Sequence, residues 1–202
     1  MLDLPDSKPW LQRLFRPAAL SLGRRGVHPN TLTLASLGGS ALAGALALAF
    51  PTAVWPLLAV LGAMALRLAL NHIDGLLARE RGLQTPWGGL LNEMATPAED
   101  IALYLPLAAR PGMPSALIVS AVMLSLLVEV AGLSALALGG TRRVDGPMTK
   151  FARGAFFGAL ALAAALGLAP APWVAVALVL VLGLLAVTAG NRLSRAVREV
   201  SP

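Results

Sequence analysis

The feature that most restricts how this chain can fold is a series of six long apolar runs, separated by short segments rich in proline or charge. About 20 apolar residues in an α-helix span the hydrocarbon core of a bilayer, and several of the runs approach or exceed that length. The sequence therefore predicts an all-α integral membrane protein with six transmembrane helices. The runs cover residues 31–50, 54–70, 88–107, 114–138, 151–168 and 172–189.

The composition agrees with a membrane protein. Of the 202 residues, 57% are hydrophobic and 13% are charged, whereas a soluble domain carries about 25% charged residues. The formal net charge is +6, and the basic residues gather at the ends of the apolar runs. Anionic lipid headgroups therefore explain this charge better than a nucleic acid partner does. The chain has no cysteine, which excludes disulfides and thiolate metal sites.

The first 27 residues are predicted to form an amphipathic helix that lies in the membrane interface. The alternative is an ordinary basic flank that only fixes the topology. The chain then divides into an interfacial segment, residues 1–27, a six-helix membrane domain, residues 28–193, and a cytoplasmic tail, residues 194–202. The apolar side of the first segment comprises Trp10, Leu11, Leu14, Phe15 and Leu20, and its cations are Lys8, Arg13, Arg16, Arg24 and Arg25.

The distribution of basic residues predicts how the helices are oriented. Every Lys and Arg except Arg110 lies in the N-terminal flank, between the second and third runs, between residues 142 and 153, or after the last apolar run, which ends at residue 189. Arg67 is counted here with the connection that it precedes. By the positive-inside rule, both termini and the connection between the second and third runs face the cytoplasm, in a bacterial inner membrane.

A spaced polar pattern, the central motif, joins the second and third runs. Polar groups placed at such a joint are costly in a membrane, so they indicate a functional site. Residues three or four apart share one face of a helix, so two facing helices would gather the polar side chains of the motif into one pocket. Their oxygens suit Mg²⁺, Mn²⁺ or Ca²⁺ rather than zinc. The pattern reads Asn71-x-x-Asp74-Gly75-x-x-Ala78-Arg79, eight further residues, and Gly88-x-x-x-Asn92-x-x-x-Thr96.

This spacing resembles the signature of the CDP-alcohol phosphatidyltransferases, D-x-x-D-G-x-x-A-R-x8-G-x-x-x-D-x-x-x-D. Asp74 keeps its carboxylate, whereas Asn71, Asn92 and Thr96 stand where the family has aspartate. The resemblance implies transfer of a phosphatidyl group from CDP-diacylglycerol, or a related CDP-alcohol, to a small hydroxyl acceptor with release of CMP. It also implies a homodimer and one or two divalent ions.

The resemblance assigns roles to individual residues. Asp74, Asn71 and Asn92 stand at metal-ligand positions, with Mg²⁺ or Mn²⁺ as the ion. Lys150 and Arg153 are candidates for binding a phosphate group on the acceptor. The nucleotide-binding positions are Gly75, Ala78, Arg79 and Gly88, together with Asn30 and Thr33 of a Pro29-Asn30-x-Leu32-Thr33 element.

Thr96 stands where the catalytic base is expected, and a hydroxyl with so high a pKa cannot act as a base near neutral pH. Glu93 and Asp100, each about one helical turn away, could supply a carboxylate instead. A single metal with the substrate's own phosphate taking the proton is a second solution. The third is a catalytically decayed protein that binds nucleotide or lipid and regulates. A small transporter that uses Glu129 is a further alternative, but the sequence shows no internal repeat to support it.

Three other features have simpler structural interpretations. Asn30 could be the N-cap of the first membrane helix. Glu129, deep in the fourth run, needs an ion-pair partner, and Arg67 and Arg153 are the nearest candidates. Small residues in the first run predict close helix packing, within the bundle or between subunits. They are Ser36, Gly39, Ser40 and Gly44.

Overall fold

The computed structural model describes residues 9–201, and the side chains from residue 13 onward. Within that range every regular element is helical, which confirms the all-α prediction. The elements are α1 (Pro9–Arg24), α2 (Pro29–Ala49), α3 (Trp55–Glu80), α4 (Pro86–Tyr104), the short 3-10 helix η1 (Leu105–Ala109), α5 (Ser115–Ala137), α6 (Lys150–Ala165) and α7 (Ala171–Val200).

Four of these helices, α2, α3, α5 and α7, are long and apolar enough to cross a membrane. The other two predicted spans fall short for different reasons. Helix α6 has 16 residues, which rise about 24 Å against a hydrocarbon core of about 30 Å. Helix α4 carries Glu93, Glu99 and Asp100 within its 19 residues. The membrane character of the chain is therefore clear, and the number of six spans stays a prediction.

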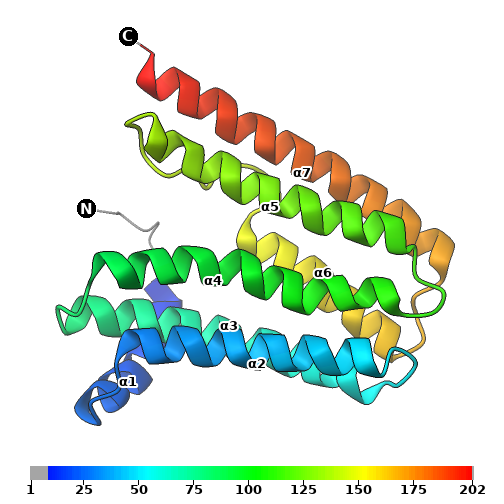
Figure 1. Ribbon diagram of the computed structural model, residues 1–202, viewed down its shortest axis with the longest axis horizontal. Helices are drawn as coiled ribbons and strands as arrows, with labels where there is room; N and C mark the ends of the chain where they lie inside the picture. The colour runs from blue at the N-terminus through cyan, green and yellow to red at the C-terminus, as the bar shows by residue number, and fades with distance from the viewer. Residues whose placement is uncertain (1–8, 202) are drawn as a thin grey trace.

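The bundle places the predicted basic connections at one end. Helix α2 packs on α3 and α4, α5 packs on α7, and α6 packs on α3. In Figure 1 the α3–α4 connection, helix α1 and the C-terminal end of α7 all lie at the left, and the α2–α3 and α6–α7 turns lie at the right. Helix α7 continues unbroken to Val200, through the predicted start of the tail at residue 194. The interfacial and tail boundaries stay predictions.

The small residues of α2 form a packing face against α4. A Cβ on Gly44 would collide with the carbonyl oxygen of Ala102, so only glycine allows this approach. Ser36 and Ser40 are buried on the same side of α2. Close packing within the bundle is thus confirmed for these three residues. Gly39 lies off this face, where an added Cβ would meet no described atom within 4 Å.

Helix α1 packs one face against the part of α3 that carries the central motif. Phe15, Ala19 and Leu22 of α1 contact an apolar cluster on α3 that includes Ile73 and Leu77. Of the other residues assigned to the apolar side, Leu14 and Leu20 are exposed. Lys8 and the side chains of Trp10 and Leu11 lie outside the described part. The position of α1 in a membrane interface stays a prediction.

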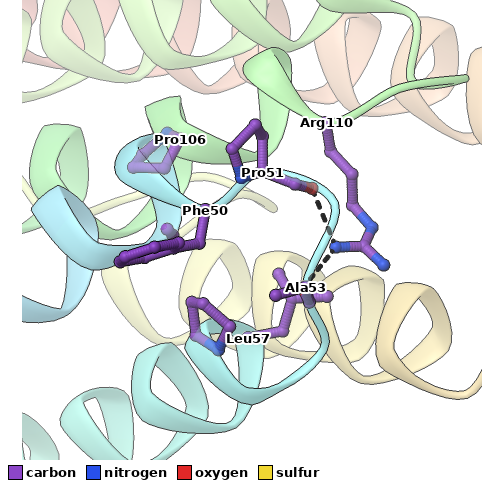
Figure 2. A pocket seen from close by; sticks show the side chains of 8 residues that line it. Phe50, Pro51, Ala53, Leu57, Pro106 and Arg110 are labelled. Atoms are coloured by element: carbon purple, nitrogen blue, oxygen red, sulfur yellow. Dashed lines mark hydrogen bonds between the residues drawn. The ribbon is translucent and has the colours of Figure 1, made fainter.

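Arg110, the exception to the charge pattern, stabilises the turn between α2 and α3. Its Nη1 donates to the carbonyl oxygens of Pro51 and Ala53, at 3.0 and 2.9 Å (Figure 2). The cavity beside it, lined by Phe50 and Leu57 among others, measures about 10 Å³. That volume accommodates about one water molecule. Arg110 is therefore a structural residue, and the cavity beside it is too small for a substrate.

Candidate active site

Helix α3 continues ten residues past the predicted end of the second span, so the first half of the central motif is helical. Asn71, Asp74 and Ala78 lie on its last three turns. Gly82, with φ of +63°, turns the chain after the helix, a conformation that favours glycine. Helix α4 then begins with the side chain of Thr85 accepting from the backbone N–H of Gly88 at 3.0 Å. The two halves of the motif therefore stand on consecutive helices joined by a short turn.

Asp74, the carboxylate that the motif retains, is buried and bonded to the start of α2. Its Oδ2 accepts a hydrogen bond from Thr33 Oγ1 at 2.7 Å. The fold thus joins Asp74 to the Pro29–Thr33 element, 41 residues earlier in the chain.

Asn30 reaches from α2 towards the N-terminal turn of α4. A Cβ on Gly88 would lie 2.8 Å from Asn30 Oδ1, so the missing side chain at Gly88 makes room for this amide. The prediction that Asn30 could be the N-cap of α2 is wrong. The cap is His28, whose Nδ1 accepts from the backbone N–H of Asn30 at 3.2 Å. The side chain of Asn30 is therefore not used as the helix cap.

The remaining nucleotide-binding candidates lie around the C-terminal turns of α3. A Cβ on Gly75 would lie 3.5 Å from Arg79 Nη1, which places this guanidinium over the glycine. Arg79 is exposed and Ala78 is half-buried. An exposed guanidinium above a small residue is a suitable group for a phosphate.

Lys150 and Thr96 meet across the bundle. Lys150 is the first residue of α6, and its Nζ donates a partly buried hydrogen bond to Thr96 Oγ1 at 2.6 Å. Thr96 Oγ1 donates in turn to the backbone oxygen of Asn92 at 3.2 Å. The hydroxyl at the expected base position therefore has both a donor and an acceptor, and a cation lies directly beside it.

The carboxylates considered as replacement bases are both in ion pairs. Glu93 Oε2 lies 2.8 Å from Arg142 Nη2. Asp100 pairs with Arg67 at 2.7 Å and with Arg153 at 3.1 Å, and it is buried. Both carboxylate oxygens of Asp100 are therefore occupied by guanidinium contacts, one from α3 and one from α6.

Arg153, one turn after Lys150, is completely buried. Its Nη2 contacts Glu129 at 2.6 Å, which confirms one of the two partners predicted for this acid. The other candidate, Arg67, pairs with Glu99 and Asp100 instead. Glu129 also lies within 3.3 Å of Arg142 and 3.6 Å of Arg192.

These pairs form one charge network through the centre of the bundle. Its formal charges cancel, which fits its burial in an apolar environment. Removing one member of such a network leaves an uncompensated charge, which costs about 3–5 kcal/mol. The members are Arg67, Arg142, Arg153 and Arg192 with Glu93, Glu99, Asp100 and Glu129.

Glu99 is the residue of this site that the motif did not reveal. It is fully buried on α4 and contacts two other helices. Glu99 accepts from Ser36 Oγ of α2 and from Asn71 Nδ2 of α3, the latter at 3.2 Å, and it pairs with Arg67 at 2.7 Å. The sequence could have indicated Glu99 by its position three residues after Thr96, because residues at that spacing share one face of a helix.

The residues present fit a divalent ion, with one charged ligand. Among the described residues, no three His, Cys, Asp or Glu side chains gather as a metal cluster. Asn71 Oδ1, however, is buried and has no hydrogen-bond partner in the described part of the chain. This oxygen and the Asp74 carboxylate are hard donors of the kind that Mg²⁺ and Mn²⁺ prefer.

Comparison with known proteins connects this geometry to a family. No protein-family model matches the chain. The chain is 38% identical over 164 residues to the inner membrane protein YnbA of Escherichia coli (strain K12), and this match covers 80% of each chain. With four apolar helices of spanning length, this relationship indicates a bacterial inner membrane protein.

The fold is similar to that of phosphatidylinositol phosphate synthase (PgsA1) of Mycobacterium tuberculosis. The structure with CDP-DAG bound matches with a TM-score of 0.77 and 20% identity, over 92% of this chain and 94% of the other. The complex with manganese and citrate gives a TM-score of 0.72, with 20% identity over 90% and 88% of the two chains. In this fold the central motif lies on α3 and α4. The chain belongs to the CDP-alcohol phosphatidyltransferase family. It is a family member whose motif retains one aspartate, Asp74.

Proposed function

We propose that this family member is a CDP-alcohol phosphotransferase of phospholipid synthesis. It transfers a phosphatidyl group from CDP-diacylglycerol, or a related CDP-alcohol, to a small hydroxyl acceptor and releases CMP. The observation that carries the proposal is the contact of Asp74 with Thr33. This contact brings the retained carboxylate and the Pro29–Thr33 element together in a fold similar to one that has CDP-DAG bound.

The nucleotide end of the substrate would bind around the C-terminal turns of α3. Gly75 and Ala78 have small side chains or none, so the ligand can approach the backbone of α3. Arg79 contributes a guanidinium for the pyrophosphate. On the opposite side, the amide of Asn30 lies beside Gly88. Asn30 and Thr33 then orient the donor from α2.

Asp74, Asn71 and Asn92 would hold one Mg²⁺ or Mn²⁺ ion, which supplies positive charge to the phosphate oxygens during transfer. The acceptor oxygen forms a bond to the phosphorus that carries diacylglycerol, and the bond from that phosphorus to the CMP oxygen breaks. The acceptor's proton passes to a phosphate oxygen of the substrate. This route uses neither Thr96 nor the paired carboxylates of Glu93 and Asp100 as the base.

Lys150 would bind the acceptor, and a phosphorylated acceptor fits its charge best. Its ammonium lies at Thr96, on the α6 side of the motif. Arg153 would act differently, because its guanidinium is completely buried in the charge network. It would hold the first turn of α6 in place and so position Lys150.

Membrane orientation and assembly complete the proposal. The basic connections place both termini and the active site on the cytoplasmic side of the inner membrane. Helix α1 would lie in the interface, where Arg13, Arg16 and Arg24 line one concave surface and meet lipid phosphates. The functional unit would be a homodimer, as the family resemblance implies.

A catalytically decayed protein that binds nucleotide or lipid and regulates is the second candidate. Two observations favour it: Lys150 holds the hydroxyl at the base position, and Glu93 and Asp100 are in ion pairs. Such a protein would keep the nucleotide-binding residues and lose turnover.

One experiment separates the two candidates. The purified protein in lipid nanodiscs receives CDP-diacylglycerol, Mg²⁺ or Mn²⁺ and a panel of phosphorylated and unphosphorylated acceptors, and CMP release is measured. Metal-dependent CMP release that Asp74→Asn abolishes supports the enzyme. CDP binding without CMP release for any acceptor contradicts it and supports the decayed protein.

A further inference from the structure

The pair formed by Asn71 and Glu99 explains why the first position of the central motif is an amide. Glu99 is held on three sides, by Ser36 of α2 and by Arg67 and Asn71 of α3. An ionised carboxylate can only accept hydrogen bonds, so Asn71 must present its Nδ2 to Glu99. The orientation of the Asn71 amide is thereby fixed.

The fixed orientation leaves the other atom of the amide free. Asn71 Oδ1 is buried and has no partner in the part of the chain that the structure describes. Asn71 and Asp74 are three residues apart on α3, so they share a helical face. A buried carbonyl oxygen without a donor is a costly arrangement, and a bound cation would satisfy it.

We propose that Glu99 is a positioning residue that makes Asn71 a neutral oxygen ligand for a divalent cation. The family motif has a carboxylate at position 71. In this chain the carboxylate belongs instead to Glu99, which contacts the side chain of Asn71. Aspartate at position 71 would place two carboxylates within hydrogen-bond distance, with Arg67 left to neutralise both. Asn71 and Glu99 therefore depend on each other, and changing either alone breaks the pair. The inference rests on the proposed function for the identity of the site.

The test is a set of three variants, Asn71→Asp, Glu99→Gln and the double substitution, in detergent or nanodiscs without substrate. The first readout is the melting temperature. Both single variants should melt below wild type, Asn71→Asp because of the facing carboxylates and Glu99→Gln because Arg67 loses a partner. The double variant should recover at least half of the larger loss, because a glutamine amide at position 99 can donate to an aspartate at position 71.

The second readout is Mn²⁺ binding, followed by the electron paramagnetic resonance of the free ion. The double variant replaces a neutral ligand by a charged one, so it should bind Mn²⁺ at least about tenfold more tightly than wild type. Asn191→Asp on α7 is the matched control and should leave Mn²⁺ affinity unchanged. It introduces the same charge on another helix.

Two results would overturn the inference: a double variant no more stable than the worse single variant, or one with unchanged Mn²⁺ affinity. Both measurements are independent of turnover. Recovery of stability with tighter Mn²⁺ binding, in a protein that never releases CMP, would uphold the role of Glu99 and reject the enzyme. CMP release by a protein whose double variant does not recover stability would support the enzyme and reject the role of Glu99.

Discussion

Replacing Arg153 by methionine tests whether this residue is structural or binds the acceptor. Arg153 is completely buried and contacts Glu129 at 2.6 Å and Asp100 at 3.1 Å. Asp100 would retain Arg67 at 2.7 Å, whereas Glu129 would keep only contacts at 3.3 and 3.6 Å. The network then carries one uncompensated negative charge.

Breaking a buried pair in this way costs about 3–5 kcal/mol. For a chain of this length each kcal/mol lowers the melting temperature by about 2–4 °C, so Arg153→Met should melt roughly 6–20 °C below wild type. Glu129→Gln in the same chain removes the excess charge, and the double variant should recover part of the loss. The coupling between the two sites should be about 0.5–3 kcal/mol.

The assay is thermal unfolding in nanodiscs, followed by tryptophan fluorescence. Arg195→Met is the matched control, because Arg195 forms an exposed ion pair with Asp145 at 2.7 Å. Exposed pairs contribute about 0–1 kcal/mol, so this variant should melt near wild type. If Arg153→Met melted like the control and only acceptor use were lost, Arg153 would be an acceptor-binding residue and the structural argument would fail.

Three further predictions concern the proposed active site. Asp74→Asn should lower CMP release at least about 100-fold, since several kcal/mol of charge stabilisation are lost; Mn²⁺ binding that survives this change would remove Asp74 from the metal site. Gly88→Ala displaces Asn30 and should weaken CDP binding up to about tenfold, the worth of one net hydrogen bond, in isothermal titration. Lys150→Met should raise the KM for a phosphorylated acceptor about 10- to 100-fold and leave the KM for an unphosphorylated acceptor unchanged. Equal effects on both KM values would refute phosphate binding by Lys150.

The sequence alone was enough to predict an all-α fold and to place the central motif at the joint between two consecutive helices, α3 and α4. A long apolar run forms a helix in lipid regardless of which segments pack beside it. Its backbone N–H and C=O groups must form hydrogen bonds within the same segment. The spacing of the central motif placed Asn71 and Asp74 on one helical face, and both lie there. The residue types also predict two contacts. A buried glutamate such as Glu129 needs a cationic partner, and a glycine such as Gly44 allows a neighbouring helix to approach closely.

The tertiary structure decided which side chains meet across helices. Glu99 lies 28 residues from Asn71, and Lys150 lies 54 residues from Thr96. Such contacts depend on the rotation and register of each helix, which the chain settles only when α2, α3, α4 and α6 pack together. The apolar pattern of one helix indicates that it can lie in a membrane. It does not specify which of several arginines a buried carboxylate will face, because every one of them would neutralise its charge.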